Sequence, residues 1–309
     1  MLKFILVVNI LFYGSLTIYA SVETGRISAE ADWMVRIDCE QFMKSSLGQI
    51  IKTELEKQEN EQKLNNFKII FGFHPINDIR NIMLYGQGEA QEKAVLLLEG
   101  NFDKTKLPAL VGLNPEYKKF LYRDLEVHQW LQKDKNAIED SAGVITYGCF
   151  FRDDLIVLSS GLPTFQQALD VLKGSTSNTS KNVFNNPLLQ DQDAFIQAAA
   201  TNVAQTVNDD AQAAIFKKTE KIIIVAGERN ESVFISVNLT AKSREVAENI
   251  NQMLEGIIAY LQLSSEEQPV LSNLAQKIQL ASSGDTVEIR LESAPGFIQQ
   301  IILENIDKK

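Results

Sequence analysis

The sequence contains few residues whose types and spacing could support catalysis. Its two histidines lie far apart: His74 precedes Pro75, and His128 lies two residues from both Glu126 and Trp130. A histidine beside a carboxylate can move protons, but catalysis also needs a reacting group within hydrogen-bond reach. Glu126, His128 and Trp130 share one face of an alternating segment. We therefore treat them as candidates for a ligand-contacting surface and assign no catalytic residue.

Two pairs of adjacent aspartates, Asp153–Asp154 and Asp209–Asp210, fall where turns or helix ends are expected. Aspartates in such places usually cap backbone N–H groups. The chain has no H-E-x-x-H or C-x-x-C motif, no phosphate-binding glycine loop and no G-x-S-x-G elbow. We therefore expect no enzyme activity, metal site or cofactor, although an exported hydrolase remains a third alternative.

The two cysteines, Cys39 and Cys149, lie in or next to segments that alternate like strands. An even number of cysteines permits a disulfide in an oxidising compartment. The alternative is two buried free thiols, which pack as small apolar side chains. Spacing alone does not decide between them, because bridging requires the two Cβ atoms to meet.

The first twenty residues differ from the rest of the chain. Lys3 is their only charge, an apolar run covers residues 4–13, and Ala20 ends a segment with small residues. This is the layout of a secretory signal peptide, and the run is shorter than the roughly 20 residues of a membrane span. We expect cleavage of residues 1–20, export to the periplasm or beyond, and no integral membrane span in the mature chain. A retained N-terminal anchor is the alternative.

The charge balance narrows the choice of partners. With 30 basic and 40 acidic residues the formal net charge is −10, and no basic stripe interrupts the acidic surface. Nucleic acids and anionic lipid surfaces are bound largely through Lys and Arg. Both are therefore poor partners for this chain.

One structural pattern occurs twice along the chain. Apolar runs in 81–100 predict a hairpin followed by a short helix at 103–112, and 221–241 predict another hairpin followed by a helix at 243–261. The helix expected at 243–261 carries an apolar stripe of Val246, Ile250, Met253, Leu254, Ile257 and Leu261. The pattern predicts an α+β protein of two related units, each a mostly antiparallel sheet with helices packed on one face.

We place the first unit at 21–174, a polar linker at 175–186 and the second unit at 187–309. The Ala-rich segment 193–207 is expected to form a helix at the start of the second unit. Whether the two sheets are separate or continuous is left open.

Three parts of the chain resemble exported bacterial proteins with repeated hairpin–helix units, a group without an assigned function. They are "DWMVRIDCEQFMKSSLGQI", "INDIRNIMLYGQG" with "VLLLEGNFDKTKLPALV", and "AENINQMLEGIIAYL". The resemblance extends over most of 31–305 and is one of pattern. It implies the α+β fold and carries no catalytic residues over to this chain.

Two kinds of function fit these observations. The first is a non-catalytic exported protein that binds a protein or envelope partner. The alternative is a carrier or sensor of a small apolar or lipid ligand, in a pocket between sheet and helix. Its expected lining is aromatic: Phe120, Tyr122, Trp130, Phe150 and Phe151. A deep apolar cavity would favour the carrier, and a solid core would favour the partner-binding protein.

Overall fold

The computed structural model describes residues 23–133, 143–179, 181, 183–203, 214–263 and 269–306. The expected signal peptide at 1–20 and the pair Asp209–Asp210 lie outside these residues.

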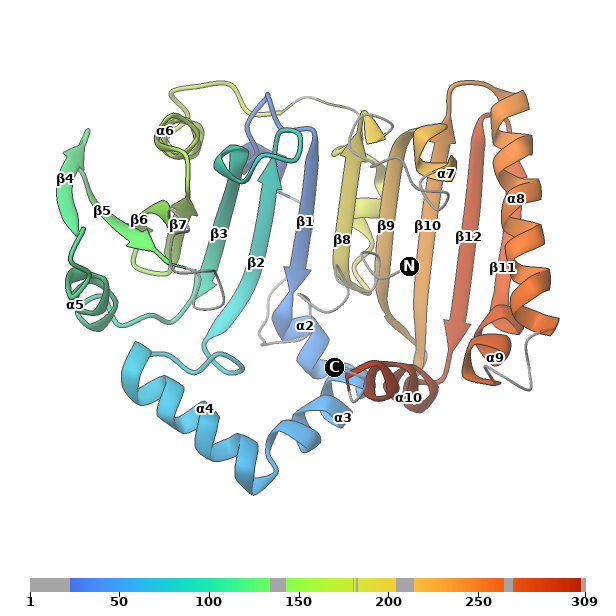
Figure 1. The fold of residues 1–309 in the computed structure, drawn as a ribbon, viewed down its shortest axis with the longest axis horizontal. Helices are drawn as coiled ribbons and strands as arrows, with labels where there is room; N and C mark the ends of the chain where they lie inside the picture. The colour runs from blue at the N-terminus through green and yellow to red at the C-terminus, as the bar shows by residue number, and fades with distance from the viewer. Residues whose placement is uncertain are drawn as a thin grey trace.

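The described residues form one 12-stranded antiparallel sheet in the order β11-β12-β10-β9-β8-β1-β2-β3-β7-β6-β5-β4 (Figure 1). The strands are β1 (Trp33–Asp38), β2 (Ile79–Gly86), β3 (Ala94–Gly100), β4 (Lys118–Tyr122), β5 (Leu125–Gln132), β6 (Val144–Arg152), β7 (Leu155–Ser159), β8 (Ala194–Thr201), β9 (Thr219–Arg229), β10 (Ser232–Ala241), β11 (Ile278–Ser283) and β12 (Thr286–Ser293). The expected hairpins at 81–100 and 221–241 are confirmed as β2–β3 and β9–β10.

Helices pack against this sheet and at its lower edge in Figure 1, which confirms the α+β class. They are α2 (Cys39–Lys44), α3 (Ser46–Leu55), α4 (Gln58–Phe71), α5 (Lys106–Gly112), α6 (Leu162–Leu172), α7 (Ala214–Lys217), α8 (Arg244–Leu263), α9 (Pro269–Lys277) and α10 (Pro295–Ile306), with short 3-10 turns η1 (Thr24–Arg26), η2 (Gln91–Lys93) and η3 (Pro187–Gln190). Within the described ranges, no helix combines the length and the apolar character needed to cross a membrane.

Strand β1 joins the two halves of the chain. Val35 pairs with Leu84 of β2 on one side and with Ala198 of β8 on the other. One sheet therefore runs through both expected units. The boundary at 175–186 stays a prediction, but part of that segment is packed, because Val183 and Phe184 are buried in the largest core cluster.

The helix expected in the Ala-rich segment 193–207 is not found among its described residues. Residues 194–201 form strand β8 instead of a helix. The strand is paired on both sides, with β1 and β9, and Phe195 and Ala199 are buried. Pairing along both edges of the strand, together with this burial, overrides the helical propensity of alanine. That propensity is only a weak preference.

The sheet is covered on both faces in the first half of the chain. Val95 and Leu97 of β3 pack in a core cluster with Phe165 and Leu169 of α6. Because side chains alternate along a strand, Leu98 points to the opposite face. That opposite face carries the candidate site.

Helix α8 is amphipathic as expected, but its apolar stripe is only partly covered. Ala247 and Ile250 near its start are fully buried against β10 and β12. Further along, Ile257 is 48% exposed, whereas Leu254, Ile258 and Leu261 are half-buried. The buried face therefore continues through Ile258, and Ile257 lies outside it.

Candidate functional site

An apolar pocket of about 290 Å³ lies between the sheet and helices α4 and α5. Its lining comes from four neighbouring strands and from the two helices and their flanking loops. The lining residues are Phe67, Phe71, Phe73, Leu98, Phe102, Leu107, Pro108, Val111, His128, Trp130, Gly148, Cys149, Phe150, Ile156 and Leu158.

Strand register explains the floor of this pocket. Ile156 of β7 pairs with Leu98 of β3 on one side and with Phe150 of β6 on the other, so the three side chains form a row across one face. Gly148 lies opposite His128 of β5. The floor is therefore a continuous apolar surface broken by one imidazole.

Gly148 keeps the floor open. A Cβ atom at this position would lie 2.7 Å from Cδ2 of Leu158 and 3.1 Å from the ring of Trp130. The missing side chain lets these two larger groups approach each other over β6. A larger residue at 148 would push them apart and into the pocket.

Helices α4 and α5 with their flanking loops form the side of the pocket opposite the sheet, which we call the roof. The position of this roof depends on two local features of the chain. Gly72 ends α4 with a φ of 78°, in the left-handed region that favours glycine. The start of α5 is held by Asp103, whose Oδ1 accepts the backbone N–H groups of Thr105 and Lys106, both at 2.9 Å. The hydrogen bonds, of which the side-chain bond from Thr105 contributes most, lower the pKa of Asp103 to about 2. The turn at Gly72 and the hydrogen bonds of Asp103 together place the end of α4 beside the beginning of α5.

A chain of aromatic rings forms the side of the pocket below α4. Phe67 stacks on Phe71 with ring centroids 4.2 Å apart, and its edge meets Phe73 at 5.2 Å. Phe73 in turn meets Phe102 at 5.2 Å in a T-shaped arrangement. Each such pair contributes about 0.5–1.5 kcal/mol beyond burial, so the rings of this wall stabilise one another.

His128 is a titratable side chain of the floor, and both of its ring nitrogens are directed at other side chains. The hydroxyl of Tyr117 lies 2.8 Å from its Nδ1, and a carboxylate oxygen of Glu126 lies 3.6 Å from its Nε2. Burial lowers the pKa of His128, and the smaller effect of Glu126 opposes this. The imidazole is therefore held neutral at neutral pH.

The structure brings together some of the residues singled out from the sequence. His128, Trp130 and Phe150 line the pocket. Glu126 is half-exposed, pairs with Lys119 and lies outside the lining. The expectation that Phe120, Tyr122 and Phe151 line a pocket is wrong, because they pack against the core cluster that contains α6.

The residues that sequence reasoning missed come from the roof and its flanking loop. Phe67, Phe71 and Phe73 lie within seven positions of each other, next to the break at Gly72. This density of phenylalanine was the available signal. It could not show which strand face would receive the rings.

Cys39 and Cys149 are both buried free thiols, so the disulfide considered above does not form. Cys39 follows β1 and Cys149 lies in β6, four interstrand steps away in the sheet order. At about 4.8 Å per step they are roughly 19 Å apart across the sheet. A disulfide requires Cα atoms within about 7 Å.

The remaining candidates for chemistry have structural partners. Asp153 pairs with Lys104 at 2.6 Å, and Asp154 pairs with Arg80 at 2.7 Å and with Arg152 at 3.1 Å. His74 is a local acceptor, as its Nδ1 lies 3.2 Å from the backbone nitrogen of Ile76. Across the described part of the chain, no group of three or more His, Cys, Asp or Glu residues could hold a metal ion.

Comparison with known proteins adds information about the fold. No protein family model and no curated protein matches this chain. The crystal form III structure of TP0453 is similar, with a TM-score of 0.50 and 9% sequence identity over 93% of this chain and 98% of that one. Crystal forms I and IV of TP0453 have TM-scores of 0.45 and 0.44 at 11% and 9% identity. At this identity the likeness concerns the α+β fold alone.

Proposed function

We propose that this protein is a non-catalytic binding protein that holds a small apolar molecule or a single acyl chain in the pocket below α4 and α5. The supporting observation is the lining, whose exposed surface is apolar. Its volume of about 290 Å³ lies at the lower end of the roughly 300–1,000 Å³ of ligand pockets. Of the two functions that fit the sequence, this observation favours the carrier or sensor, and a protein or envelope partner stays a prediction.

His128 would contribute ring surface to the pocket, because the exposed lining is apolar. Its Nδ1 lies 2.8 Å from the Tyr117 hydroxyl and its Nε2 lies 3.6 Å from Glu126, so both nitrogens are directed at protein groups. We therefore expect apolar contacts to hold the ligand, between Trp130 and the aromatic rings of α4.

Binding can be measured with a fluorescent fatty acid added to the purified chain. We expect saturable binding, and we expect Val111→Trp to weaken it at least about tenfold because the indole would fill the pocket from α5. Leu113→Trp is the matched control. It adds the same side chain two positions away, where Leu113 is 80% exposed, and should leave binding unchanged. Equal binding by the wild type and Val111→Trp would rule out this pocket.

We also propose that the protein acts after export. The support is the arrangement of Lys3, the apolar run and Ala20 at the start of the sequence. Mass spectrometry of the protein from the periplasmic fraction of an expressing bacterium tests this. A mass that begins at or near Ser21 supports export, and an intact Met1 in the cytosol contradicts it.

A further inference from the structure

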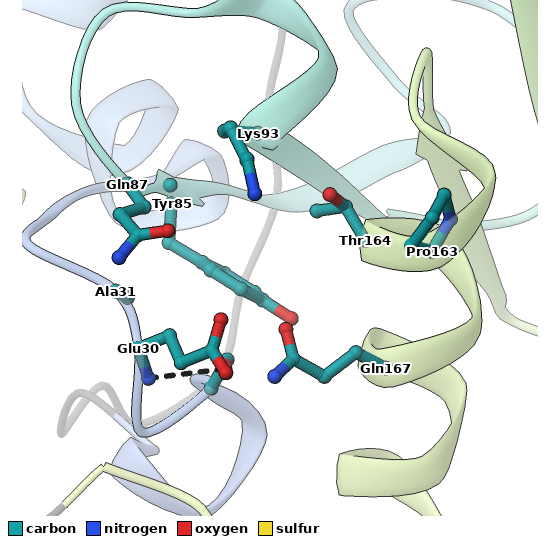
Figure 2. Close-up of a pocket in the computed structure, with 10 residues that line it drawn as sticks. Glu30, Ala31, Tyr85, Gln87, Lys93, Pro163, Thr164 and Gln167 are labelled. Carbon is teal, nitrogen blue, oxygen red and sulfur yellow. Dashed lines mark hydrogen bonds between the residues drawn. The ribbon is translucent and has the colours of Figure 1, made fainter.

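A second pocket, of about 230 Å³, lies on the opposite face of the sheet from the apolar one. Tyr85 of β2 contributes to its wall and also packs in the core cluster with α6, whereas Leu98 of the apolar pocket points the other way. The second pocket has a different chemistry. Polar and charged side chains from three separate segments converge on it (Figure 2).

The hydroxyl of Tyr85 is the unusual group in this pocket. The residue is 2% exposed, and its hydroxyl finds no hydrogen-bond partner among the described residues. Burying a hydroxyl without a partner is unfavourable, because its hydrogen bonds to water are lost and not replaced. Figure 2 shows the ring reaching across the pocket, with the hydroxyl between Glu30 and Gln167. The site therefore contains a donor and acceptor that a ligand could satisfy.

Two opposite charges face the same space without contacting each other. Lys93 of η2 and Glu30, from the segment before β1, both line the pocket and are both exposed at its mouth. Neither forms an ion pair with any described residue. Figure 2 shows them entering from opposite sides, with the Tyr85 ring between them. A molecule that carries both a negative and a positive group could therefore pair with both charges across the Tyr85 ring.

The start of α6 strengthens the site for the negative group. Thr164 lies in the first turn of this helix, which has no side-chain cap and no acidic residue in that turn. Backbone N–H groups and the helix dipole favour an anion at such an end. Figure 2 places Thr164 on the side of the pocket where Lys93 enters. Because the lining has a single Lys, it can balance the charge of a monoanion better than that of a dianion.

We propose that this pocket binds a small zwitterion. Its monoanionic group lies between Lys93 and the first turn of α6, its ammonium group faces Glu30, and the Tyr85 hydroxyl hydrogen-bonds to it. Two sources supply this chemistry, a free neutral α-amino acid and a phosphoethanolamine group. A plain anion fits less well because Glu30 would repel it, and a plain cation because Lys93 would.

Isothermal titration calorimetry on the full chain tests this site with L-alanine, L-serine, L-glutamine and glycerophosphoethanolamine as probes; the last is a phosphodiester and carries one negative charge. We expect saturable binding of an amino acid or of glycerophosphoethanolamine, which also identifies the source. Acetate and ethylamine, which each carry half of the charge pattern, should bind at least about tenfold more weakly.

Three variants and one control locate the binding. Lys93→Gln and Glu30→Gln should each weaken it at least about tenfold, and Lys118→Gln, which changes an exposed lysine of the edge strand β4, should leave it unchanged. Tyr85→Phe should weaken binding without lowering stability, because the removed hydroxyl has no described partner.

The proposal is overturned if none of the four probes binds, if acetate binds as well as they do, or if Lys93→Gln and Glu30→Gln leave binding intact. None of these results bears on the apolar pocket, which Val111→Trp tests separately.

Discussion

The hydroxyl of Tyr117 lies 2.8 Å from Nδ1 of His128, at the edge of an apolar pocket floor. The contact holds an otherwise mobile ring in one orientation. Burial of His128 lowers its pKa below the ordinary value of 6.5, although the nearby Glu126 carboxylate acts in the opposite direction. Folding therefore favours the neutral form of the imidazole.

Stability should depend on pH through His128. Because its pKa is lower in the folded than in the unfolded state, the unfolded chain binds more protons below about pH 6.5, and the free energy of unfolding should fall as the pH falls through this range. Urea unfolding from about pH 7.5 to about pH 5.5 measures this change. His128→Gln should show a smaller fall. The pKa of His74 is also lowered, but its contribution is common to both proteins and cancels. Identical pH dependences would contradict the assignment to His128.

The buried ion pair of Arg36 and Asp38 in β1 should be sensitive to the loss of one partner. The two side chains are 3% and 2% exposed and their charged atoms lie 3.0 Å apart. Asp38→Ala should lower the free energy of unfolding by about 3–5 kcal/mol, because it leaves the guanidinium buried and unpaired. It also removes the cap on Gln41 at the start of α2.

An exposed pair provides the control for this measurement. Arg244 and Glu248 are 80% and 53% exposed and lie 2.9 Å apart on α8. Glu248→Ala should change stability by no more than about 0.5 kcal/mol. Similar losses from Asp38→Ala and Glu248→Ala in chemical denaturation would show that the Arg36 pair is not buried in solution.

Helix α8 should show graded sensitivity along its apolar stripe. Ile250 is fully buried, so Ile250→Ala should cost about 2–5 kcal/mol. Ile257 lies two turns later and is 48% exposed, so Ile257→Ala should stay within about 0.5 kcal/mol. Urea unfolding of the two variants compares the same truncation on one helix. A cost for Ile257→Ala close to that of Ile250→Ala would mean that another surface covers this end.

Both thiols should be unreactive in the folded protein. Burial raises the pKa of Cys149 to about 12 and that of Cys39 still further, so almost no thiolate forms near neutral pH. Iodoacetamide should leave the native protein unmodified and should modify two sites after unfolding in guanidinium. A protein lighter by two hydrogens, with no modification after unfolding, would instead indicate a disulfide.

Much of the fold follows from local patterns in the sequence. The hairpin β9–β10 and the helix α6 with its face of Phe165, Ala168 and Leu169 were predictable, because period and turn residues specify them locally. Strand β8 was not. Ala198 and Ala199 favour a helix in isolation, and only the pairing with β1 and β9 makes them a strand.

The candidate site was predictable only in part. Trp130 and His128 were identified from alternation along one strand, but alternation does not say which face a helix will cover. For that reason Phe120 and Phe151 were expected in the pocket lining, although they pack against the core cluster that contains α6. The roof residues Phe67 and Phe71 approach the floor only through the turn at Gly72, and this is a long-range relationship that no local pattern contains.

The position of β1 at the centre of the sheet has a consequence for biosynthesis. Among the described strands β1 is made first and its partner β2 follows at 79–86, but its other edge is completed only when residues 194–201 have emerged. Until then the unfinished sheet presents an open edge that can pair with other chains. Contacts between residues so distant in sequence also slow folding. The chain should therefore need protection from aggregation during its synthesis or transport more than a protein with two self-contained halves would.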